Sequence, residues 1–76
     1  MKELLEYIVK ELVDEPDAVQ VRERGGRGSV TLELTVAQND TGKVIGRGGR
    51  VAKAVRDVLG VAATRERKRV QLDIRS

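Results

Sequence analysis

The chain of 76 residues has no cysteine and no histidine, and Tyr7 is its single aromatic residue. Without cysteine, neither a disulfide nor a thiolate metal site can stabilise the fold, so apolar burial has to do so alone. Without histidine or cysteine, the usual proton shuttle and thiol nucleophile of enzymes are missing, and the scattered acids form no metal cluster. We therefore expect a non-catalytic protein with no metal and no other cofactor.

Long apolar runs are also missing. Residues 1–6 carry acids where a signal peptide needs a basic start, and no later stretch has the length of a membrane span. This pattern predicts a cytoplasmic protein that does not bind membranes. The length allows one domain, residues 1–76, with one modest core.

The charges are unevenly distributed along the chain, whose net charge is +3. Residues 43–56 hold five cations and no acid, whereas residues 1–17 hold two lysines and six acids. A nucleic acid is therefore expected to approach the middle of the sequence and to be repelled by its start. A basic stretch alone is more often only a solvated helix face. The motif around it therefore has to show whether these cations contact a nucleic acid.

Hydrophobic periodicity predicts a helix and a β-hairpin in the first half of the chain. Apolar residues recur at helical spacing between positions 4 and 13, and Pro16 ends this run. Apolar and polar residues then alternate over 19–22 and again over 30–36, as in strands with one buried face. The glycines between 25 and 28 are expected to close the hairpin.

Two helical segments are predicted in the second half. Asp40 or Thr41 is expected to cap a short helical turn. Helical spacing then resumes near Gly49 and continues through Gly60 to about Thr64, despite a glycine penalty of about 1 kcal/mol. The competing interpretation ends this helix at Gly60.

Alternation returns over 70–75, which predicts a third strand. The order α-β-β-α-α-β indicates an α+β domain whose three-stranded sheet is covered on one side by helices. Two basic groups lie outside the central segment. Residues 65–69 are interpreted as a charged turn, with an auxiliary phosphate contact as the alternative, and Arg22, Arg24 and Arg27 flank the hairpin as candidates to reach a nucleic acid at its rim.

The segment that carries chemistry is Gly46-Arg47-Gly48-Gly49, between the two helical segments. Its glycines allow a ligand to approach the backbone, and the amino end of the following helix favours an anion such as phosphate. Arg47 and Arg50 are expected to pair with phosphate oxygens. The spacing excludes two other phosphate loops, because a P-loop needs Ser or Thr where Val44 stands and a dinucleotide fingerprint needs glycine where Val51 stands.

The stretch from Gly42 to Arg56 resembles the KH signature, in which a Val-Ile-Gly turn, a GxxG loop and an apolar-spaced helix follow one another. The resemblance covers the whole chain, because the predicted element order is that of a single type II KH domain. In length and pattern the chain is most similar to the small stand-alone bacterial KH proteins of the KhpA family.

The resemblance implies that the protein binds single-stranded RNA in the cytoplasm as a dimer, as a post-transcriptional regulator or RNA chaperone. It also implies frequent pairing with a larger KH-containing partner of the KhpB kind, linked to the control of cell shape, envelope and division. Carried over by position, it implies that Gly46, Arg47, Gly48 and Gly49 clamp the RNA, with Val44 and Ile45 beside them. The cations Lys43, Arg50 and Lys53 complete the expected RNA-binding set. Val51, Ala52 and Val55 would support the adjoining groove. Gly60 and the off-stripe Val61 are a candidate dimer contact.

The scarcity of aromatic residues decides between modes of RNA recognition. Base stacking on a ring platform is not available, which excludes an RRM and leaves backbone clamping beside an aliphatic groove. A site of about four nucleotides is expected to bind weakly in a single domain. The alternatives are a single-stranded DNA binder, a protein-interaction or dimerisation module and, disfavoured by its three glycines, a DNA-binding helix-turn-helix.

Overall fold

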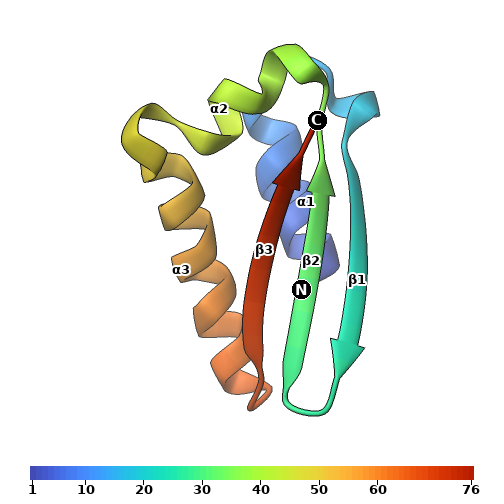
Figure 1. The fold of residues 1–76 in the computed structure, drawn as a ribbon, viewed down its shortest axis with the longest axis vertical. Helices are drawn as coiled ribbons and strands as arrows, with labels where there is room; N and C mark the ends of the chain where they lie inside the picture. Colours follow the sequence, from blue (N-terminus) through green and yellow to red (C-terminus); the bar gives the residue numbers. More distant parts are fainter.

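The computed structural model describes all residues from 1 to 76, and its elements follow the predicted order α-β-β-α-α-β (Figure 1). The helices and strands are α1 (Lys2–Leu12), β1 (Gln20–Gly26), β2 (Ser29–Thr35), α2 (Thr41–Ile45), α3 (Arg50–Arg65) and β3 (Arg69–Arg75). Three single turns of 3-10 helix lie between them, at Pro16–Ala18, Gln38–Asp40 and Arg47–Gly49. The α+β class and the type II KH order are confirmed.

The sheet is mixed, with the strand order β1-β2-β3. The hairpin makes β1 antiparallel to β2, whereas the crossover through α2 and α3 returns β3 parallel to β2. Helices α1 and α3 lie on the same face of the sheet, and the other face carries no helix (Figure 1). This one-sided covering confirms the prediction, and it places α3 beside the edge strand β3.

The core lies between the sheet and the two long helices. Strand β2 is central, and its inward residues alternate with polar ones as a half-buried strand requires. The fully buried apolar side chains are those of Leu5, Val9, Val30, Leu32, Leu34, Val44 and Leu59. The core therefore draws on α1, β2, α2 and α3, and all residues in it are aliphatic.

The glycine-rich stretch closes the hairpin, as expected. Strand β1 continues through Gly25 and Gly26, which both pair with residues of β2. Only Arg27 and Gly28 form the turn, and Gly28 has a φ of 72°, a conformation that glycine adopts without strain. The expected closure of the hairpin between residues 25 and 28 is thus confirmed, and the exposed Gly25 and Gly26 still pair as part of the strand.

Helix α3 runs unbroken through Gly60 and ends at Arg65, so the alternative of a helix ending at this glycine is wrong. The hydroxyl of Thr64 donates to the carbonyl of Gly60 at 2.8 Å, so this carbonyl accepts a side-chain hydrogen bond in addition to its place in the helix. None of the helices combines the length and the apolar character needed to cross a membrane.

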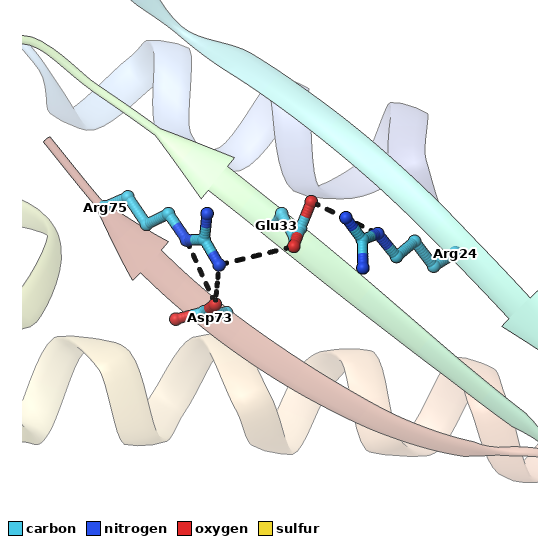
Figure 2. A network of polar contacts seen from close by, with 4 residues as sticks. All are labelled: Arg24, Glu33, Asp73 and Arg75. Atoms are coloured by element: carbon cyan, nitrogen blue, oxygen red, sulfur yellow. Dashed lines mark hydrogen bonds and ion pairs between the residues drawn. The ribbon is translucent and has the colours of Figure 1, made fainter.

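The open face of the sheet carries a network of ion pairs across all three strands. Figure 2 shows Glu33 on β2 between Arg24 on β1 and Arg75 on β3, with N···O distances of 3.6 and 3.4 Å. Arg75 also donates to Asp73 from Nε and Nη2, at 3.1 and 3.0 Å. The side chain of Glu33 is only 9% exposed, so its two arginines compensate a carboxylate that is largely removed from water.

Candidate nucleic-acid interface

The loop between α2 and α3 has a backbone that glycine alone fits at its first position. Gly46 has φ 77° and ψ 170°, a combination found almost only for glycine. A Cβ atom built on Gly46 would lie 2.4 Å from Cγ2 of Val51 and 2.9 Å from its backbone nitrogen. The start of α3 therefore occupies the space that any side chain at Gly46 would need.

The other two glycines of the loop are left-handed, with φ 63° at Gly48 and φ 78° at Gly49, and both face open space. Two backbone hydrogen bonds hold the loop, from Gly46 N–H to the carbonyl of Gly42 at 2.8 Å and from Gly49 N–H to the carbonyl of Gly46 at 3.1 Å. The loop is thus a defined turn, and the space around Gly48 and Gly49 is open to a ligand.

The cations near this loop differ in how far their charge is already compensated. Arg47 and Arg50 are exposed and form no ion pair. Lys53 pairs with Asp57 one helical turn further along α3, at 3.1 Å, and both side chains are well exposed. The two arginines beside the glycines are therefore free to meet an anion, as is the exposed Arg56 further along α3.

Lys43, expected to contact RNA, is instead paired with Asp14. The hydrogen bond from Lys43 Nζ to the Asp14 carboxylate is the main cause that raises the pKa of this lysine above its ordinary value. The partner lies 29 residues earlier in the chain, so the pair links the segment after α1 to α2. Lys43 keeps its proton, but its positive charge is largely offset before any ligand arrives.

Asp40 anchors the same region from inside. Its carboxylate is fully buried and accepts the backbone N–H groups of Asp14 at 3.1 Å and Glu15 at 3.0 Å. It occupies the N-cap position of α2, as one of the two predicted candidates, but its side chain makes no cap hydrogen bond. The capping role is therefore wrong, because the carboxylate is used to hold the segment that follows α1.

The two apolar residues before the loop have different positions. Val44 is fully buried and belongs to the core, so its expected RNA contact is wrong: α2 has five residues and needs this side chain to pack on the rest of the fold. Ile45 is 39% exposed and precedes the first loop glycine. Of this pair, only Ile45 is accessible to a nucleotide.

The structure has an apolar groove of about 360 Å³ beside the loop, formed between α1 and α3. Its lining residues are Ile8, Leu12, Arg50, Val51, Ala54, Val55 and Val58. Val51 and Val55 are thus placed where groove support was expected, whereas Ala52 is buried and lies outside the lining. The contribution of α1 was missed, although the apolar spacing of Ile8 and Leu12 was visible in the sequence.

The fold is similar to part of a solved structure, the crystal structure of Era in complex with MgGDPNP and nucleotides 1506–1542 of 16S ribosomal RNA. The similarity covers 97% of this chain and 28% of that chain, with a TM-score of 0.59. At 18% sequence identity, this likeness establishes the fold alone.

Sequence relatives are much closer. An RNA-binding protein KhpA from Clostridium acetobutylicum is 58% identical over 74 residues, which cover 97% of this chain and 99% of the relative. An RNA-binding protein KhpA from Borreliella burgdorferi is 51% identical over 72 residues, covering 95% of this chain and 88% of the relative. The family model described as KhpA/KhpB, KH domain, matches residues 2–74, and the chain therefore belongs to the KhpA/KhpB KH domain family.

Proposed function

We propose that the protein binds single-stranded RNA in the cytoplasm and that the loop Gly46–Gly49 clamps the RNA backbone. The observation that carries this proposal is the defined glycine loop next to two arginines without ion pairs, Arg47 and Arg50. The names of the relatives support RNA as the ligand, since both curated proteins described above are called RNA-binding proteins.

In this mechanism the phosphates lie against the open side of Gly48 and Gly49, where no side chain prevents their approach. The first turn of α3 presents its positive dipole end to the same place, and the two arginines add charge-assisted hydrogen bonds. The bases meet aliphatic rather than aromatic surface, with Ile45 as the exposed apolar side chain beside the loop. A site for about four nucleotides without stacking is expected to bind weakly.

The proposal is tested with the double variant Arg47→Ala, Gly48→Asp. Because the Cβ at position 48 faces open space and Asp tolerates a left-handed backbone, the fold is expected to survive. The variant places a carboxylate where a phosphate is expected, so affinity for single-stranded RNA falls at least about tenfold. A control with the same change in charge, Lys10→Ala on α1 with Gln20→Asp on β1, leaves affinity unchanged.

The same assay is run with single-stranded DNA and duplex DNA at matched salt, because affinity depends steeply on salt. Single-stranded RNA is expected to bind best. Preferential binding of duplex DNA would overturn the assignment in favour of a helix-turn-helix reader. Unchanged crosslinking of RNA to the Arg47→Ala, Gly48→Asp variant would reject the loop as the clamp.

We also propose that the protein acts as a dimer, in a role of post-transcriptional regulation or RNA chaperoning. Five of the six large apolar side chains that are exposed belong to the two long helices: Leu4, Tyr7 and Leu12 on α1, Val58 and Val61 on α3. Leu12 and Val58 line the groove between α1 and α3, and helical spacing places Leu4 one turn from Ile8 and Val61 one turn from Val58. Exposed apolar side chains gathered around a groove mark an interaction surface.

A second copy fits this face because residues 1–17 carry six acids against two lysines, whereas the first half of α3 is basic, so that an isologous contact can bring opposite charges together. Gly60 has open space beside it and Val61 is 60% exposed, which leaves both free for the expected contact. A larger KH-containing protein of the KhpB kind is the alternative occupant, in keeping with the family that joins the two names.

The dimer is tested by sedimentation of Val61→Asp against the parent protein. We expect a dimeric parent and a monomeric variant, because a charge at the centre of an apolar contact is left unpaired. Glu66→Gln, a nearby exposed substitution outside the apolar face, serves as the control and stays dimeric. A parent that is monomeric at tens of micromolar, or a variant that remains dimeric, contradicts the proposal.

A further inference from the structure

The end of α3 opposite the glycine loop carries a second group of cations that the proposed clamp does not use. There the turn between α3 and β3 lies beside the turn of the β1–β2 hairpin, at the far end of the long axis from the loop (Figure 1). The two turns are joined by a hydrogen bond from the backbone N–H of Arg69 to the carbonyl of Gly28, at 2.9 Å. Segments joined by residues 41 apart in the sequence thus form one surface.

We name this surface the turn patch. It consists of Arg27, Arg65, Arg67, Lys68 and Arg69. All five side chains belong to exposed residues and none takes part in an ion pair, although Glu66 lies among them. On the open sheet face, by contrast, Arg24 and Arg75 are paired with carboxylates. The charge of the turn patch is therefore uncompensated within the fold.

The backbone of the turn is held in place. Three hydrogen bonds close it, from Glu66 N–H to Ala63 at 3.0 Å, from Arg67 N–H to Thr64 at 3.0 Å and from Lys68 N–H to Ala63 at 2.8 Å. Arg67 has a φ of 57° and is the single residue other than glycine with a positive φ. Glycine or asparagine is the usual residue in this position after a helix, so an arginine there keeps a cation at a strained position.

From these observations we infer that the turn patch is a second contact for the phosphates of the same RNA strand. The inference rests on the proposed function, because the strand must also engage the loop Gly46–Gly49. Helix α3 has 16 residues and separates the two sites by about 24 Å at 1.5 Å per residue. With about 3.4 Å per stacked nucleotide, a strand needs about seven nucleotides to bridge this distance.

The length of the RNA therefore separates the two sites. A strand of four nucleotides fills the loop alone, whereas a strand of twelve reaches the turn patch as well. An exposed group of like charges usually does no more than solvate a turn. Here the fixed backbone, the strained Arg67 and the lack of any carboxylate partner for the five cations favour a polyanion as the ligand.

The test is a triple variant, Arg27→Gln, Arg67→Gln and Lys68→Gln. Its matched control is Lys2→Gln, Lys10→Gln and Gln20→Glu, which lowers the net charge by the same amount at exposed residues outside the patch. The affinity of each protein for single-stranded RNA of four and of twelve nucleotides is measured over a range of salt concentrations. Both the parent and the loop variant Arg47→Ala, Gly48→Asp are included.

For the patch variant, we expect binding of the twelve-nucleotide RNA to weaken about fivefold more than in the control, with the salt slope reduced by about 2 for three lost phosphate contacts. Binding of the four-nucleotide RNA is expected to match that of the control. If the patch and control variants weaken binding of the longer RNA equally while the loop variant loses binding, the role of the turn patch is overturned and the proposed function is not. A parent that binds neither RNA overturns the proposed function and the turn patch together.

Discussion

The glycine loop and the open face of the sheet both present arginines, but the pair Arg47 and Arg50 and the pair Arg24 and Arg75 are used differently. Arg24 and Arg75 lie beside Glu33, and Arg75 also holds Asp73, so their charge is taken up within the protein (Figure 2). Arg47 and Arg50 have no carboxylate partner. A count of basic residues along the sequence does not distinguish the two regions, whereas the partners of each cation do.

The region around the glycine loop also contains a buried carboxylate, which does not pair with an arginine. Asp40 lies in the 3-10 turn that leads into α2 but is fully buried and accepts two backbone N–H groups, so it does not compensate the loop arginines. On the sheet, Glu33 is nearly buried and does compensate its neighbours. Two buried acids thus have different consequences: Asp40 holds a backbone segment in place, whereas Glu33 pairs with the arginines beside it.

The largest expected effect is the loss of Asp40. Asp40→Ala removes the acceptor of two N–H groups and is expected to lower the free energy of unfolding by about 3 kcal/mol, since bonds to charged groups are worth about 1.5–3 kcal/mol each. Asp40→Asn keeps one acceptor oxygen and is expected to cost less. Urea denaturation of the three proteins measures the difference. An Asp40→Ala variant as stable as the parent contradicts the anchoring role.

The next effect compares two glycines of the loop. Gly46→Ala is expected to lower the free energy of unfolding by about 2 kcal/mol, because it combines a glycine-only backbone with a clash against Val51. Gly48→Ala meets no neighbour and is expected to cost only about 1 kcal/mol for its left-handed backbone. Thermal or urea unfolding of both variants checks the order. If Gly48→Ala were the more destabilising, the described geometry of the loop would be wrong.

A third experiment substitutes one arginine in each of the two regions and compares the effects on RNA binding. Arg47→Gln is expected to weaken binding of single-stranded RNA about fivefold, which is roughly 1 kcal/mol, because it removes an unpaired cation beside the clamp. Arg75→Gln removes the same charge from the sheet, where it is already paired, and is expected to leave affinity within about twofold of the parent. Fluorescence anisotropy with a labelled RNA measures both. Equal losses would show that overall charge, not its availability, determines binding.

The smallest expected effect concerns Lys43 and pH. Because Asp14 raises the pKa of this lysine in the folded protein, the pair stabilises the fold fully below the ordinary lysine value of 10.5. The contribution is lost as the pH rises through the higher folded-state pKa. The stability difference between the parent and Lys43→Met, measured by urea denaturation, should therefore be constant from neutral pH up to that value and shrink above it. A difference that grows above pH 10.5 would contradict the pairing.

The element order, the continuous α3 and the glycine loop were predictable because hydrophobic spacing and glycine positions are local signals. The expectation of a non-catalytic domain is confirmed by membership of the KhpA/KhpB KH family. What local signals could not reveal are contacts between distant segments. The pairing of Lys43 with Asp14 joins residues 29 apart, and Asp40 turns to a segment 25 and 26 residues earlier.

Burial at the loop was the second source of error. Val44 and Ile45 are adjacent and both apolar, but only the structure shows that the first packs into the core and the second faces outward. The groove likewise depends on how α1 lies against α3, which periodicity on either helix does not determine. The assignment of the individual RNA-contacting residues stays a prediction.

The most direct test of the contrast between the two regions is to map RNA contacts on the protein by NMR. Backbone amide shifts are followed while a single-stranded RNA of four nucleotides is added to the parent protein. The largest changes are expected from Gly46 to Arg50, and the amides of Arg24, Glu33 and Arg75 are expected to stay unchanged. Shifts concentrated on the open face of the sheet, with the loop unaffected, would contradict the account.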